Sequence, residues 1–279
     1  MGALAAHKGY KGKCLNACKE FLEGYDIEGV GFLDRIITGD ESWIFQHNPD
    51  FKRSNAEWHH KDSTKLNKPS ITASAGKILL ALLTVSKGCI LEDFLPKGQA
   101  INSIAYSKLT EWPSWRLRRH ASIGTSSAWN WGAFKKTLSG EGLSQVTGLS
   151  VYLGIMRCLR EAVRLKRPER WQNNDWILHV GNARPHTAHV VLQFLAKHST
   201  IQIPHPPYSL DLAPNDFFLY PKLKINLKGR KFDNVDMIQA ESKATLRNLS
   251  KSDFISCFDN WKKRWNGCIE AGGAYFEKY

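Results

Sequence analysis

Two aspartates are the residues with which this chain could do chemistry. Asp40 follows the strand-like run 35–38, and Asp216 lies in the segment Leu-Ala-Pro-Asn-Asp-Phe-Phe at 212–218. Carboxylate oxygens are hard ligands that suit Mg²⁺ and similar ions, so two acids from distant segments would form part of a metal site if the fold brings them together. Taken singly, each has an ordinary structural interpretation, Asp40 as a turn residue and Asp216 as a helix N-cap.

A third segment identifies the context of these acids. Residues 176–188 read Trp-Ile-Leu-His-Val-Gly-Asn-Ala-Arg-Pro-His-Thr-Ala. They resemble the stretch that carries the second catalytic aspartate in mariner-family transposases of the Tc1/mariner superfamily, where Asp-Asn-Ala-Arg-Pro-His follows an apolar strand. Gly181 stands in the place of that aspartate. The thirty-four residues 182–215 that separate it from Asp216 match the spacing that marks the mariner group.

The resemblance extends over most of residues 14–103 and 151–279. Other segments similar to the family, in the family's order, are 36–43, 92–95, 205–209, 221–224 and 261–265. Mariner transposases also carry two N-terminal helix-turn-helix units that read the transposon ends, and this sequence begins after them. The resemblance therefore implies the catalytic domain of a transposase.

The activity that the resemblance implies is DNA transposition, through endonuclease cleavage and strand transfer at transposon ends with two Mg²⁺ or Mn²⁺ ions. Asp40 would bridge both ions, Asp216 would complete the second site, and residue 181 would complete the first. Glycine offers no ligand, and Asn182 would point to the other face of the strand. We therefore expect weak metal binding and impaired catalysis. Two alternatives are a non-catalytic DNA-binding or dimerising protein derived from a transposon, and a decayed element without function.

The hydrophobic pattern favours an α/β fold with a ribonuclease H-like mixed sheet, three antiparallel strands followed by parallel strands, and flanking helices; the resemblance implies the same fold. The strands are expected at 35–38, 43–46, 77–86, 89–95, 176–180 and 201–203. The helices are expected at 14–26, 151–166, 185–197, 217–229, 235–249 and 251–272, with Ser250 capping the last.

The predicted domain organisation is a lead-in helix and linker at 1–31 and a catalytic domain at 32–279, interrupted by an insertion at 104–150. This insertion holds four of the ten tryptophans and has no convincing period. Tryptophans interleaved with arginines are compatible with a base-stacking surface for DNA. The alternative is non-coding sequence carried into the reading frame.

The charge of the chain favours a polyanionic partner. Its formal net charge is +13 and its pI is about 9.5, and each phosphate that Lys or Arg neutralises releases condensed counterions. The candidate phosphate contacts are Lys222, Lys224, Lys228, Arg230 and Lys231. Such runs are also typical of a solvated face, so both interpretations stay open.

Other sequence features exclude several classes of protein. The longest apolar run, 78–85, is far short of the roughly 20 residues needed to span a bilayer, which predicts a soluble intracellular protein without a membrane partner. The six cysteines form no Cys-x-x-Cys pair, so neither a disulfide scaffold nor a zinc ribbon is indicated. The resemblance implies a nuclear location, DNA as partner, and a homodimer or association with an intact transposase.

Overall fold

The part of the chain that the structure describes contains one sheet of five strands. The computed structural model describes residues 2–47, 76–95, 148–206 and 209–274. Strands β1 (Ile36–Phe45), β2 (Lys77–Val85) and β3 (Gly88–Leu95) form an antiparallel meander. Strands β4 (Ile177–Val180) and β5 (Ile201–Pro204) are parallel to β1, and the order in the sheet is β3-β2-β1-β4-β5. The prediction of a ribonuclease H-like mixed sheet is confirmed.

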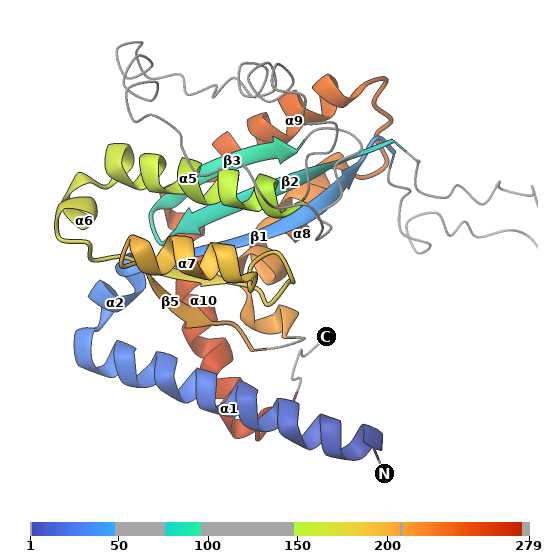
Figure 1. The fold of residues 1–279 in the computed structure, drawn as a ribbon. Helices are drawn as coiled ribbons and strands as arrows, with labels where there is room; N and C mark the ends of the chain where they lie inside the picture. The colour runs from blue at the N-terminus through green and yellow to red at the C-terminus, as the bar shows by residue number, and fades with distance from the viewer. Residues whose placement is uncertain (1, 48–75, 96–147, 207–208, 275–279) are drawn as a thin grey trace, which may run out of the picture.

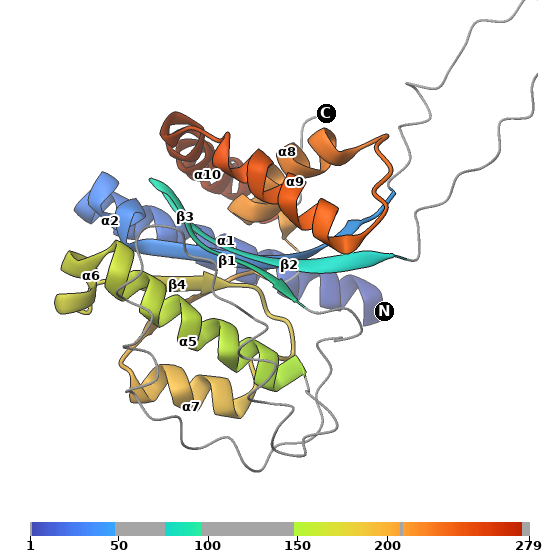
Figure 2. The ribbon, with the colours of Figure 1, turned by 90° about the horizontal axis from the view of Figure 1, so that it is seen from above.

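Helices cover both faces of this sheet (Figures 1 and 2). One face carries α5 (Gly148–Lys166), α6 (Pro168–Gln172) and α7 (His189–Lys197), and the other carries α8 (Tyr220–Leu227), α9 (Val235–Arg247) and α10 (Lys251–Glu270). The remaining elements are α1 (Gly2–Glu28), α2 (Val30–Arg35), a 3₁₀ turn at Leu210–Leu212 and a π-helical turn at Asn215–Leu219.

Strand β2 explains why the protein has a core on each side of the sheet. All of its residues except Lys77 are buried. Successive side chains of a strand point to opposite faces. Leu79, Ala81 and Leu83 accordingly join the cluster under α5 and α7, whereas Leu80 and Leu82 join the cluster under α8 and α9. A strand buried on both faces reads as an unbroken apolar run, as this one does.

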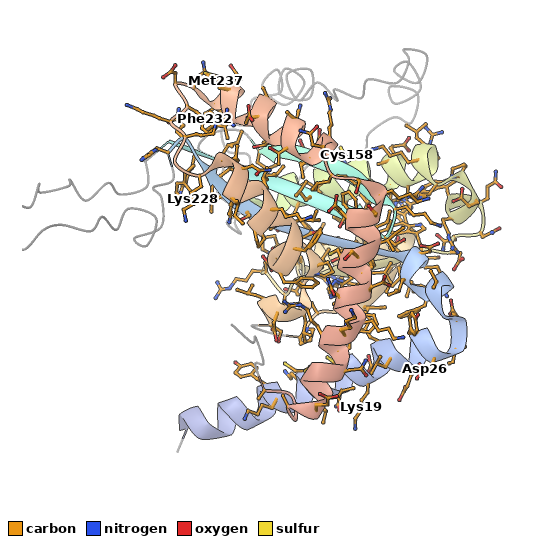
Figure 3. The ribbon with its side chains drawn as sticks, turned by 180° about the vertical axis from the view of Figure 1, so that it is seen from behind. Lys19, Asp26, Cys158, Lys228, Phe232 and Met237 are labelled. Atoms are coloured by element: carbon orange, nitrogen blue, oxygen red, sulfur yellow. The ribbon has the colours of Figure 1, made fainter. Side chains whose placement is uncertain are left out.

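The first and last helices of the described chain pack against each other. Phe21 of α1 stacks on Trp265 of α10 with ring centroids 4.8 Å apart, and Trp261 and Trp265 have no exposed surface. Cys14 and Cys18 lie buried in the same cluster, as expected for cysteines that serve packing. Figure 3 shows α1, with Lys19 and Asp26 labelled, lying beside α10. Residues 2–28 form one helix that is much longer than the predicted 14–26.

Two predicted boundaries are wrong. The strands expected at 35–38 and 43–46 are one strand, because β2 pairs without interruption with residues 38–45. The helix expected to begin at Pro185 begins at His189. The preceding residues form a turn instead, in which the N–H groups of His186 and Thr187 donate to the carbonyl of Ala183.

Two helix ends agree with their sequence signals. Ser250 caps α10 in a capping box with Asp253, as predicted. Gly229 follows α8 with a left-handed φ of 71°, which glycine adopts without strain. Of the expected insertion 104–150, residues 104–147 lie outside the described residues, and α5 begins at Gly148. Within the described ranges, no helix has the length and apolar character to cross a bilayer.

Candidate active site

Asp40 lies where the sheet divides. Strand β1 pairs with β4 only from Ile36 to Gly39, but its pairing with β2 continues, with Asp40 opposite Leu82. Because Gly39 lies opposite Val180, the next residues, Asp40 and Gly181, stand side by side at the division. The two positions also project to the same face of the sheet, because residues directly opposite each other on neighbouring parallel strands do so.

Hydrogen bonds from the residues on either side of Asp216 attach its turn to the sheet beside Asp40. Asn215 has no exposed surface, and its amide donates to the carbonyl of Leu82 at 2.9 Å and accepts from the Thr84 hydroxyl at 3.1 Å. Five residues later, the Tyr220 hydroxyl donates to the carbonyls of Asp40, at 2.5 Å, and Leu80, at 3.2 Å. Asn215 is the first residue of the π-helical turn and Tyr220 directly follows it, so two anchors to the sheet flank Asp216.

The carboxyl groups of Asp40 and Asp216 are hydrogen-bonded to each other. Burial, followed by the charges of Asp216 and Glu41, raises the pKa of Asp40. Burial also raises the pKa of Asp216, although its hydrogen bond with Asp40 acts in the opposite direction. Two partly buried carboxyls in contact disfavour a second negative charge, so the pKa of each lies above the ordinary value of an aspartate. The structure thus brings together the two acids that the sequence singles out.

Gly181 leaves room for a side chain. A Cβ atom at this position would have no heavy atom of the described residues within 4 Å, its chain neighbours aside, and the backbone is not in the left-handed region. The neighbouring amide of Asn182 is engaged elsewhere, since it donates to the carbonyl of His205. Among the described residues, no group of three or more His, Cys, Asp or Glu side chains is arranged to hold a metal ion. The donors present therefore do not fit a pair of divalent ions.

A buried histidine adjoins the site on the opposite face of β1. His186 is 1% exposed; its Nε2 lies 3.1 Å from Glu41 Oε2, and its Nδ1 lies 2.8 Å from the carbonyl oxygen of Gly181. The Tyr152 ring stacks on it at 4.1 Å. Burial alone would lower the pKa of His186, but the hydrogen bond and charge of Glu41 outweigh it and raise the pKa. His186 thus ties the turn after β4 to β1. Nothing in the sequence pairs His186 with Glu41, because the two residues are 145 positions apart.

The five basic residues proposed to contact DNA do not share one face. Lys222 pairs with Asp253 of α10 at 2.5 Å, and Arg230 pairs with Glu241 of α9 at 2.6 Å. Lys224 instead points toward β1, where its Nζ donates to Ser42 Oγ at 2.7 Å. Lys231 forms an isolated bridge with His47, and Lys228 lies just beyond the end of α8 (Figure 3). Lys224 therefore adjoins the site, whereas Lys222, Arg230 and Lys231 have partners away from it.

Two curated proteins are similar to this chain in sequence. Human histone-lysine N-methyltransferase SETMAR is 26% identical over 246 residues, which are 88% of this chain and 29% of that protein. The mariner Mos1 transposase of Drosophila mauritiana is 24% identical over 264 residues, which are 94% of this chain and 61% of that protein. The chain thus spans less than two thirds of either relative. No family model matches it.

Solved structures of Mos1 share the fold. A pre-cleavage Mos1 transpososome superposes with a TM-score of 0.70 at 22% identity, covering 97% of this chain and 64% of that one. The Mos1 catalytic domain with raltegravir and Mg superposes with a TM-score of 0.61 at 22% identity, covering 95% and 96%. Another matching Mos1 complex contains paired ends and Mn. The fold of this chain is therefore that of the Mos1 catalytic domain.

Proposed function

We propose that this chain, a homologue of the mariner-family transposases with the fold of their catalytic domain, derives from an enzyme that cut and joined DNA and has lost most of that activity. The observation that carries the proposal is the hydrogen-bonded pair of Asp40 and Asp216 beside an open position at Gly181. Two acids of the catalytic set would remain in place, and the third would be absent.

The missing carboxylate accounts for the impairment. Transfer of a phosphoryl group between oxygens by two metal ions requires ligands that hold both ions against the reacting phosphate. Gly181 contributes none, and Asn182 is committed to His205. The two acids that remain would hold Mg²⁺ or Mn²⁺ weakly. A deficit of about 4 kcal/mol in transition-state stabilisation would already slow turnover roughly a thousandfold.

The test is nicking of supercoiled plasmid DNA in Mg²⁺ and in Mn²⁺. We expect the unaltered chain to nick no faster than Asp40→Ala, and Gly181→Asp to nick measurably, because the open space beside residue 181 accepts a carboxylate without displacing a neighbour. Gly181→Asn is the matched control, with nearly the same shape and no charge. Robust nicking by the unaltered chain that Asp40→Ala abolishes would overturn the proposal.

The partners and location follow from the same homology. We propose that the protein binds DNA in the nucleus and that it dimerises with itself or with an intact transposase. The net charge of +13 supports a DNA partner, as do the Mos1 complexes with transposon ends. A non-catalytic DNA-binding role is the second candidate, because it needs the basic surface and not the third acid. DNA binding without nicking by any of these variants would favour it.

A further inference from the structure

Lys224 is the cation of α8 that faces the acidic pair. Its Nζ donates to Ser42 Oγ at 2.7 Å, and Ser42 follows Asp40 by two residues on the same face of β1. The Nζ atom of Lys224 lies over the ring of Tyr220, 5.6 Å from its centroid. The ring that anchors the Asp40 carbonyl therefore also borders Lys224.

The charges of Lys224 and the acids act on one another. Burial lowers the pKa of Lys224, and the charges of Asp216 and Asp40 act against that shift. Lys224 in turn favours the charged form of Asp216. Glu41 is the other acid that acts on the pair, but its carboxylate is hydrogen-bonded to His186 on the opposite face. Lys224 is thus the basic side chain that the described structure directs at Asp40 and Asp216.

This orientation is specific to residue 224. Lys222 lies on the same helix two residues earlier and turns away from the sheet to pair with Asp253. Its Nζ also lies over the ring of Phe218, 4.4 Å from the centroid. Two lysines of similar exposure on one helix therefore have different partners, and only substitution of Lys224 would alter the charge at the acidic pair.

We propose that Lys224 is an internal counter-ion of the Asp40–Asp216 pair and that it weakens the binding of divalent metal there. The inference rests on the proposed function, since it assigns the pair to a former metal site. A single ammonium group offsets part of the charge that the two acids would present to a divalent ion, and it repels that ion at short range. Gly181 adds no third negative charge, so the two acids attract a divalent ion less strongly. The positive charge of Lys224 then competes successfully with that ion for the acidic pair.

The experiment is a titration of the purified chain with Mn²⁺, with free and bound ion followed by electron paramagnetic resonance. We expect Lys224→Met and Lys224→Gln to bind one Mn²⁺ at least about tenfold more tightly than the unaltered chain. Lys224→Arg, which keeps the charge, and Lys222→Met, which removes a charge from the same helix, should bind as weakly as the unaltered chain. Adding Asp40→Asn to Lys224→Met should abolish the gain. Circular dichroism verifies that each variant is folded.

Equal Mn²⁺ affinity in all of these proteins, including no detectable binding by any, would overturn the inference. A gain of the same size in Lys222→Met would do so too, because it would reflect net charge alone. These outcomes are separate from the nicking test, since the titration needs no DNA and no catalysis. Robust nicking by the unaltered chain would contradict the proposed function. An Mn²⁺ affinity that does not change when Lys224 is replaced would contradict the counter-ion role, and the two results come from separate measurements.

Discussion

At the scale of single residues, Asn215 anchors the turn that carries Asp216. Its buried amide satisfies the carbonyl of Leu82 and the hydroxyl of Thr84. Asn215→Ala would leave both groups without that partner inside the protein. We expect the free energy of unfolding to fall by about 2 kcal/mol, measured by urea unfolding of the metal-free chain.

The matched control is Asn266→Ala on α10. Asn266 is exposed, and its amide donates to the carbonyl of Lys262 within the same helix, so its removal should change the free energy of unfolding by less than about 0.5 kcal/mol. If the two variants lost the same small amount, Asn215 would not be an anchor of the turn.

A buried pair of histidines predicts how stability depends on pH. His179 Nε2 lies 3.1 Å from His205 Nδ1, and His179 Nδ1 lies 3.0 Å from Thr38 Oγ1. Burial lowers the pKa of His205 to about 4 and lowers the pKa of His179 as well. In the unfolded chain each histidine takes up a proton near pH 6.5, whereas in the folded chain protonation requires a lower pH. Their contribution to stability is therefore complete above pH 6.5 and is lost as the pH falls toward 4.

The expected slope is about 1 kcal/mol of unfolding free energy per pH unit for each histidine in this window. His205→Gln should reduce the pH dependence measured by urea unfolding between pH 6.5 and 4.5. His189→Gln, at an exposed position of α7, should leave it unchanged. A flat profile for the unaltered chain over this range would contradict the prediction.

At the scale of elements, the turn after α10 fixes the contact between the two ends of the described chain. Gly273 has φ +79°, and a Cβ atom there would lie 2.1 Å from the main-chain oxygen of Lys11 in α1. Gly272 has φ +61° with nothing within 4 Å of its Cβ position. Gly272→Ala should cost about 1 kcal/mol for the left-handed backbone, and Gly273→Ala should cost at least about 1 kcal/mol more. Equal losses of unfolding free energy would show that α1 does not pack so closely on this turn.

The elements show what the sequence could and could not predict. Strands β2 and β3 and helices α9 and α10 follow from apolar period and caps, and they were predicted within a few residues. The continuity of β1 was missed because its middle, Gly39 to Ser42, is small and polar. Pairing with the buried strand β2 keeps these residues extended. Such long-range pairing overrides local propensity and leaves no local signal.

The candidate site was predictable to a similar extent. The family-like contexts of Asp40 and Asp216 predicted two acids that the structure does bring together, but their catalytic and metal-binding roles stay predictions. The partners that hold them, Asn215 and Tyr220, could not be found in the sequence because their contacts lie on strands more than a hundred residues away. The sequence does not show that Lys222 and Lys224 have different partners, Asp253 and Ser42, and phosphate contact by the basic run stays a prediction.

At the scale of the whole molecule, the net charge predicts how the affinity for DNA depends on salt concentration. With a charge of +13, we expect binding to short duplexes that weakens by about 100-fold or more between 50 and 200 mM salt. Affinity for transposon-end and random sequences should be similar. Fluorescence anisotropy at several salt concentrations measures both. Tight, salt-resistant binding to one inverted repeat would contradict this expectation.

Two lysines test where the DNA lies. Lys231 is exposed and forms an isolated bridge with His47, so Lys231→Gln should reduce the salt slope by about 1 if this residue contacts a phosphate. Lys87 lies in the turn between β2 and β3 and pairs with Asp34. Lys87→Gln removes the same charge and should leave the slope unchanged.

The open space beside Gly181 bears on how easily a carboxylate could be introduced at this position. In the genetic code, glycine codons that end in a pyrimidine differ from aspartate codons at the second base alone. Because no heavy atom of the described residues lies within 4 Å of a Cβ placed at residue 181, the first side-chain atom of an aspartate there needs no second substitution to make room. If Gly181 has such a codon, one base change would place an aspartate there, whereas a site closed by repacking would require several coordinated changes.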